Sequence, residues 1–184
     1  MAKDDLGGKR DQEEDYFRKK DREMLERMRR AAADAAVGAQ TGIQDPELLR
    51  DIEALGFDAD KLSLLPLVPI LQVAWADGEI SPEERKLIVD LARTRNIAEG
   101  SPADRQLAEW LDTIPPPGAF ARADRLVAAM LAAHSGPAHD LSAADLVRYC
   151  ESIAQASGGI LGLGKVSAAE RAAIEKIQNA LKRR

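Results

Sequence analysis

The most apolar part of the chain is residues 62–76, where almost every position is hydrophobic. A helix that is apolar on all sides is normally buried, so we expect this segment at the centre of a helical bundle. It is shorter than the roughly 20 apolar residues that a membrane span needs. It also contains Pro66 and Pro69 and is followed by Asp77. The pattern therefore predicts a buried central helix and no transmembrane segment.

Apolar residues recur at helical spacing on both sides of this segment, and capping residues mark where each helix begins. The expected helices start near Asp45, Ser81, Ser101, Phe120, Leu141 and Ser167. The run PPPG at residues 115–118 separates two halves, because proline stops helix propagation. We expect an all-α fold in which residues 43–184 form a bundle of about six to seven helices.

The two halves resemble each other weakly. Residues 73–85 can be aligned with residues 153–158 and, after an insertion, with residues 165–171. This alignment predicts two helix-turn-helix pairs related by a pseudo-two-fold axis. Ser157 takes the place of Asp77 in the second copy, so the first copy is the better candidate for ion binding.

Residues 1–42 form a separate region, which we interpret as a charged helical arm and linker. Residues 1–30 contain ten Lys and Arg against nine Asp and Glu, a mixture that cannot drive collapse into a core. We expect a helix over residues 11–36 that is broken at Gly38 and Gly42. Its narrow apolar stripe suits docking onto a protein partner; the stripe includes Tyr16, Phe17, Leu25 and Met28.

The composition of the chain excludes several classes of partner and site. The formal net charge of −5 argues against nucleic acid as the main partner. A single cysteine, Cys150, excludes a disulfide framework and a cysteine-based zinc site. The first residues carry no apolar run typical of a signal peptide, so we expect a cytoplasmic protein.

The segment after the central helix allows two interpretations. Ser81, Pro82 and Glu84 form a complete helix start in which Glu84 closes a capping box. The same residues match half of a calcium loop, with Asp77 at loop position five and Glu84 at position twelve. The earlier loop positions offer no carboxylate, so an ordinary EF-hand is excluded. Capping alone and a divalent-cation site both remain open.

The run AWADGEISPEER at residues 74–85, which follows the buried helix, resembles the TerB-like family of tellurite-resistance proteins. The resemblance covers roughly residues 62–181. It implies an all-helical, acidic, cytoplasmic domain that is linked to metal stress and binds calcium. We therefore expect an acidic surface that binds a divalent cation, with calcium as its ligand; the candidate metal residues are Asp77, Glu79, Glu83 and Glu84.

The arm has a resemblance of its own. Residues 8–25 are similar to the inhibitory segment of the ATP synthase inhibitor protein family, although the basic pair precedes Tyr16 by fewer residues. In that family the segment becomes helical as it enters the F1 sector and blocks ATP hydrolysis. The resemblance implies a regulatory inhibitor with F1 ATPase as its partner; the candidate contact residues are Tyr16, Phe17, Arg18, Arg22, Glu23 and Leu25.

No recognisable catalytic set is present, so we do not expect an enzyme. The segment at residues 159–165 imitates a phosphate-binding P-loop, but Val166 occupies the position that needs a hydroxyl group. The two histidines, His134 and His139, share one loop without a second ligand cluster. We expect instead a non-enzymatic TerB-like interaction module linked to stress or metals, with an F1 inhibitor as the alternative.

Overall fold

The computed structural model describes residues 5–133, 136–156 and 166–182, and every regular element in these ranges is helical. The chain divides into two compact units, Met1–Ala36 and Val37–Arg184. The all-α fold predicted from the sequence is confirmed. None of the described helices combines the length and the apolar character that crossing a lipid bilayer requires.

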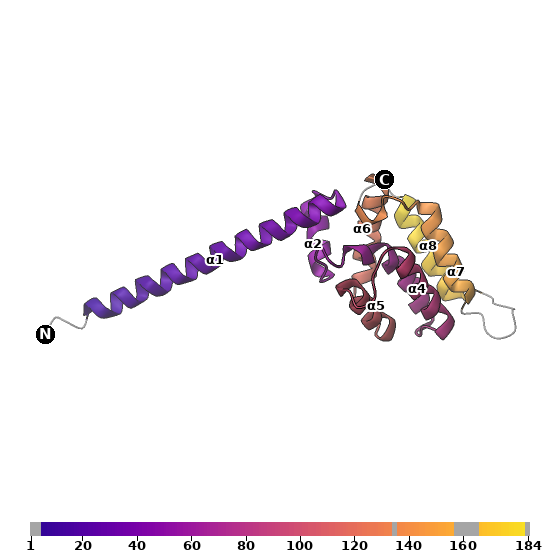
Figure 1. Cartoon of the computed structure of the whole chain (residues 1–184), viewed down its shortest axis with the longest axis horizontal. Helices are drawn as coiled ribbons and strands as arrows, with labels where there is room; N and C mark the ends of the chain where they lie inside the picture. The colour runs from indigo at the N-terminus through magenta and orange to yellow at the C-terminus, as the bar shows by residue number, and fades with distance from the viewer. Residues whose placement is uncertain (1–4, 134–135, 157–165, 183–184) are drawn as a thin grey trace. The chain divides into compact units, whose positions relative to one another are not determined.

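The described residues form eight α-helices and three short 3-10 helices (Figure 1). The α-helices are α1 (Asp5–Thr41), α2 (Pro46–Ala54), α3 (Val68–Ala74), α4 (Pro82–Thr94), α5 (Pro102–Asp112), α6 (Ala119–Ala133), α7 (Ala143–Ala156) and α8 (Ala168–Lys182). The 3-10 helices are η1 (Leu62–Leu67), η2 (Trp75–Asp77) and η3 (Gly136–Ala138). Helices α2 to α8 supply the predicted bundle.

The long helix α1 is supported by charge spacing and by alanine. Opposite charges lie four residues apart at Asp15 and Lys19 and at Glu26 and Arg30, a spacing that stabilises helices. The predicted break at Gly38 is wrong, because α1 continues to Thr41. A single glycine costs a helix only about 1 kcal/mol relative to alanine. The backbone hydrogen bonds also continue past Gly38, because the Gly42 N–H donates to the Gly38 carbonyl oxygen over 2.8 Å.

The central apolar segment is buried as predicted, but it is not one helix. Leu64, Leu65 and Leu67 are fully buried in η1, and the chain becomes α-helical only from Val68. Proline explains the division, because Pro69 lacks the N–H that an α-helix would bond to the carbonyl four residues earlier. Pro69 is tolerated in the first turn of α3, where that N–H has no intrahelical partner.

Helix α3 forms the centre of the bundle. All seven of its residues are buried, and it contacts α4, α6, α7 and α8. Helices α7 and α8 pack side by side (Figure 1). The pair α3 and α4 also contacts the pair α7 and α8 crosswise, α3 against α8 and α4 against α7. The pseudo-two-fold repeat requires contacts of this kind and itself stays a prediction.

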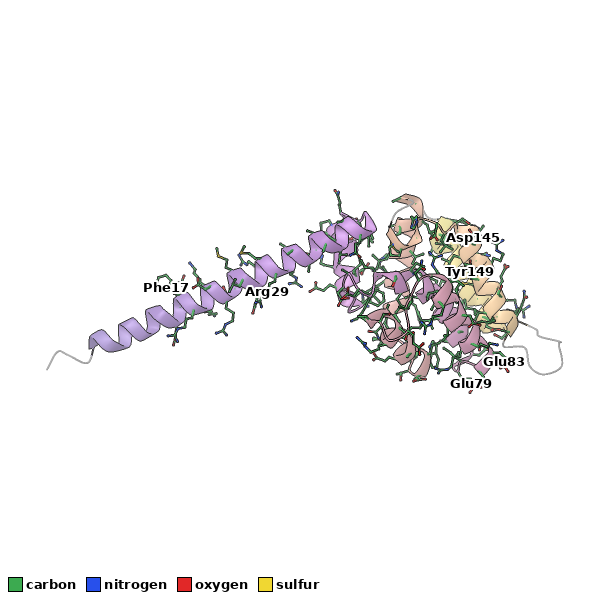
Figure 2. The ribbon with its side chains drawn as sticks, in the orientation of Figure 1. Phe17, Arg29, Glu79, Glu83, Asp145 and Tyr149 are labelled. Carbon is green, nitrogen blue, oxygen red and sulfur yellow. The ribbon has the colours of Figure 1, made fainter. Side chains whose placement is uncertain are left out.

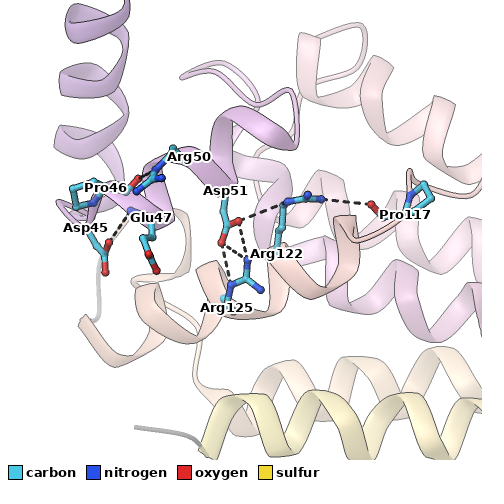
Figure 3. A network of polar contacts seen from close by, with 8 residues as sticks. All are labelled: Asp45, Pro46, Glu47, Arg50, Asp51, Pro117, Arg122 and Arg125. Carbon is cyan, nitrogen blue, oxygen red and sulfur yellow. Dashed lines mark hydrogen bonds and ion pairs between the residues drawn. The ribbon is translucent and has the colours of Figure 1, made fainter.

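A carboxylate on α2 ties that helix to α6 (Figure 3). The Arg125 guanidinium donates to both Asp51 carboxylate oxygens, with Nη2 at 2.8 Å from Oδ1 and 2.6 Å from Oδ2. The Arg122 Nε lies 3.7 Å from Asp51 Oδ1 and adds a weaker ion pair. The Asp51 side chain is only 14% exposed, so this network holds its geometry better than an isolated surface pair would.

Candidate functional site

The start of α4 is a capping box, as the sequence predicts. The Glu84 backbone N–H donates to Ser81 Oγ over 3.2 Å. The Glu84 carboxylate oxygen Oε2 accepts from the Ser81 N–H and from the Ser81 hydroxyl, both over 2.8 Å. These bonds satisfy two backbone N–H groups that a helix start would otherwise leave without partners. Glu84 is 2% exposed, so its carboxylate serves this cap from inside the protein.

The start of α8 repeats the arrangement. The Ser167 N–H donates to Glu170 Oε2 over 2.6 Å, and the Glu170 N–H donates to Ser167 Oγ over 3.0 Å. The Ser167 hydroxyl also donates to Asp77 Oδ1 over 2.7 Å. Asp77 ends η2, so this bond joins the turn of the first predicted copy to the helix start of the second.

Three carboxylates therefore share one region, at the starts of α4 and α8. Burial is the main cause that raises the pKa of Glu84 above its ordinary value. Hydrogen bonds from Ser81 oppose this shift, whereas the negative charges of Glu170 and Asp77 raise the pKa further. The signal for Glu170 was present in the sequence, because the repeat alignment places Ser167 and Glu170 opposite Ser81 and Glu84.

The other two predicted metal residues are both exposed, Glu79 in the turn before α4 and Glu83 in the first turn of α4 (Figure 2). Across residues 5–133, 136–156 and 166–182, no three His, Cys, Asp or Glu side chains form a group that could hold a metal ion. The structure therefore shows the capping role of Glu84 directly. Calcium binding by Asp77, Glu79, Glu83 and Glu84 stays a prediction.

The second candidate site is the arm, which we define as residues 15–36 of α1. Every residue of the arm is exposed, including the predicted contact residues Tyr16, Phe17, Arg18, Arg22, Glu23 and Leu25. Phe17 is 61% exposed and projects from the helix (Figure 2). The Tyr16 and Phe17 rings meet edge to face with centroids 5.9 Å apart, and Lys20 Nζ lies 5.1 Å from the Tyr16 centroid.

The apolar stripe of α1 contains one more exposed residue than the sequence pattern predicted. Met24 is 64% exposed, as is Met28. Met24 and Met28 follow Phe17 by seven and eleven residues, which places all three within about 40° around a helix of 3.6 residues per turn. Phe17, Met24 and Met28 therefore form one apolar stripe along the arm, and helical spacing alone could have identified it.

The cysteine and the histidine that the structure describes form no candidate catalytic or metal site. Cys150 is fully buried, and burial raises the pKa of its thiol to about 12, so it is an unreactive core side chain. His139 Nδ1 lies 3.0 Å from the Gly136 carbonyl oxygen, within hydrogen-bond distance. The P-loop-like segment at residues 159–165 and His134 lie outside the described residues.

Comparisons with protein families, with curated proteins and with solved structures found no match for this chain.

Proposed function

We propose that this protein is a non-enzymatic helical interaction protein whose arm docks into a groove on a protein partner. The observation that carries the proposal is the exposed stripe of Phe17, Met24 and Met28, whose side chains are 61%, 64% and 64% exposed. Large exposed apolar side chains gathered on one face of a helix are typical of an interaction site. Anchors spaced seven and eleven residues apart suit a groove that accepts one face of a helix.

The energetics favour this use of the stripe. Burying one side chain of this size is worth roughly 1.5–3 kcal/mol, so three anchors supply a gross gain of about 5–9 kcal/mol. Association itself costs about 4–15 kcal/mol, so the three anchors supply a large share of the binding energy and contacts beside them must supply the rest. The charged residues around the stripe keep the arm soluble while the protein is free.

The F1 sector of ATP synthase is the partner that the inhibitor resemblance suggests. Tyr16 and Phe17, which carry part of the resemblance, are exposed. In this version of the proposal the arm enters the F1 sector and the bundle stays outside it. Titrating the full chain into purified F1 particles and following ATP hydrolysis tests this partner specifically.

Affinity capture from extracts of the source organism tests the docking function without assuming a partner. The double variant Phe17→Ser with Met24→Ser removes the stripe, whereas Lys19→Ser with Glu26→Ser changes two residues on the opposite face of α1. We expect partners held by the wild-type chain and by the opposite-face variant to be lost from the stripe variant. Equal capture by all three proteins would contradict the proposal.

A second candidate function is a response to a divalent cation at the start of α4. The observation that favours it is the repulsion of the Glu84 carboxylate by Glu170 and Asp77, which a bound cation would relieve. Oxygen ligands suit calcium better than softer metals. The exposed Glu79 and Glu83 would add carboxylates if the turn before α4 and the first turn of α4 rearranged around the ion.

A further inference from the structure

Asp124 on α6 is a buried carboxylate that none of the preceding roles uses. The residue is 5% exposed, and within the described part of the chain its Oδ1 atom has no hydrogen-bond partner. A buried polar atom without a partner is costly, so its position calls for a specific explanation. No sequence pattern indicates its burial, because Asp124 lies between Ala123 and Arg125 in an ordinary amphipathic helix.

A hollow of about 470 Å³ opens beside this carboxylate, between α6 and α8. Ala121, Ala172 and Ala180 contribute small apolar walls. Glu175, Lys176 and Asn179 on α8 also line the hollow. The site thus combines a buried anionic group with space for a short alkyl chain, as small-molecule sites commonly do.

The charges near Asp124 determine which ligand would fit. Arg125 also lines the hollow, but its guanidinium is held by Asp51 on α2. The Lys176 charge attracts the Asp124 carboxylate, yet no ion pair joins these two described residues. Helix α7 contributes Cys150, whose thiol has a pKa of about 12 and is neutral. Helix α3 and η1, which also pack against α6, contain no charged residue.

We propose that this hollow binds a short primary alkylammonium group, with the ammonium paired with the Asp124 carboxylate and the alkyl chain lying against the three alanines. With Arg125 held by Asp51, the lining carries the carboxylates of Asp124 and Glu175 against the one ammonium of Lys176. One net negative charge remains, which matches one positive charge on a ligand. A divalent cation needs more oxygen ligands than the hollow offers, and Asp124 and Glu175 both repel an anion. The proposal is independent of the arm and of its partner.

The pKa of Asp124, raised by burial to about 6 in spite of the Lys176 charge, adds a measurable signature. An alkylammonium ion stays charged well above neutral pH, whereas Asp124 becomes protonated as the pH falls through about 6. Ammonium binding therefore weakens about tenfold between pH 7.5 and pH 5. The hydroxyl group of a neutral alcohol carries no charge for Asp124 to attract and loses far less affinity.

The test is an NMR titration of the ¹⁵N-labelled full chain with n-butylammonium chloride, with 1-butanol as the neutral probe. We expect saturable chemical-shift changes in α6 and α8 when the ammonium ion is added. Asp124→Asn should bind it at least tenfold more weakly. Glu151→Gln, which changes a carboxylate outside this hollow, should bind it as the wild type does. Three results would overturn the proposal: no saturable shifts, equal affinity for 1-butanol, or full affinity in Asp124→Asn. The pH dependence in the wild-type chain decides the matter if the Asn variant folds poorly.

Discussion

The Ser167 hydroxyl donates to Asp77 Oδ1 over 2.7 Å, although the two residues lie 90 positions apart in the sequence. The same oxygen atom of Ser167 accepts the N–H of Glu170 at the start of α8. One hydroxyl group thus caps a helix and fastens that helix to the turn before α4. This relationship joins the two pairs of helices at the place where the buried carboxylates meet.

Replacing Ser167 with Ala removes both the cap and the bond to Asp77. We expect a loss of about 1.5–3 kcal/mol in the free energy of unfolding, since a cap is worth about 1 kcal/mol and a hydrogen bond to a charged group somewhat more. Ser101→Ala is the matched control, because Ser101 caps α5 in the same way by accepting from the Asp104 N–H. Urea denaturation of both variants measures the difference. Equal losses would show that the bond to Asp77 adds no stability.

Asp124 should make the fold less stable as the pH rises. Its pKa is about 6 in the folded protein against 3.8 for an ordinary aspartate, so between these values the folded chain binds more protons than the unfolded chain. The free energy of unfolding therefore falls as the pH rises through this window, by up to about 3 kcal/mol in all. Asp124→Asn should be more stable than the wild type at pH 7.5 and nearly equal to it at pH 4.

Thermal or urea unfolding over this pH range measures the effect, with Asp90→Asn as a control that changes an exposed carboxylate. A stability difference between Asp124→Asn and the wild type that stays constant with pH would contradict the assignment.

The arm should contribute nothing to the stability of the bundle. Phe17 is 61% exposed, so Phe17→Ser should change the free energy of unfolding of the bundle by less than about 0.5 kcal/mol. Leu71→Ala, at a fully buried position of α3, should cost about 2–5 kcal/mol. Tryptophan fluorescence reports on the bundle alone, because Trp75 and Trp110 both belong to it. A large loss with Phe17→Ser would show that the stripe is a structural element.

Calcium binding can be separated from capping by comparing two substitutions. Both Asp77→Ala and Ser167→Ala break the bond between these residues, but only the first removes a carboxylate. If calcium binds near α4, metal-free protein should gain about 2.7 kcal/mol at a calcium concentration 100 times the dissociation constant. The gain should persist in Ser167→Ala and vanish in Asp77→Ala. Melting curves without any calcium-dependent shift in the wild type would leave Asp77 and Glu84 with structural roles only.

Local signals made much of the fold predictable. The capping box at Ser81 and Glu84 involves neighbouring residues, so the sequence alone identified it. The predicted break at Gly38 does not occur, because one glycine is too weak a helix breaker to end a helix among alanines. The division of the central segment near Pro69 follows from backbone chemistry and could have been anticipated.

Tertiary relationships were harder to predict. Nothing local pairs Ser167 with Asp77, since their contact depends on how α8 packs against η2. The burial of Asp124 likewise results from α8 covering α6, and no charge or spacing in the sequence indicates it. Met24, in contrast, was visible at helical spacing from Phe17 and could have been included in the stripe.

The most direct test of the docking function is the affinity of a captured partner for three forms of the full chain, measured by calorimetry. The forms are the wild type, Phe17→Ser with Met24→Ser, and Lys19→Ser with Glu26→Ser. Loss of two buried anchors should weaken binding at least 100-fold, while the opposite-face variant should bind within about threefold of the wild type. Equal affinities for all three forms would show that the exposed stripe is not the docking surface.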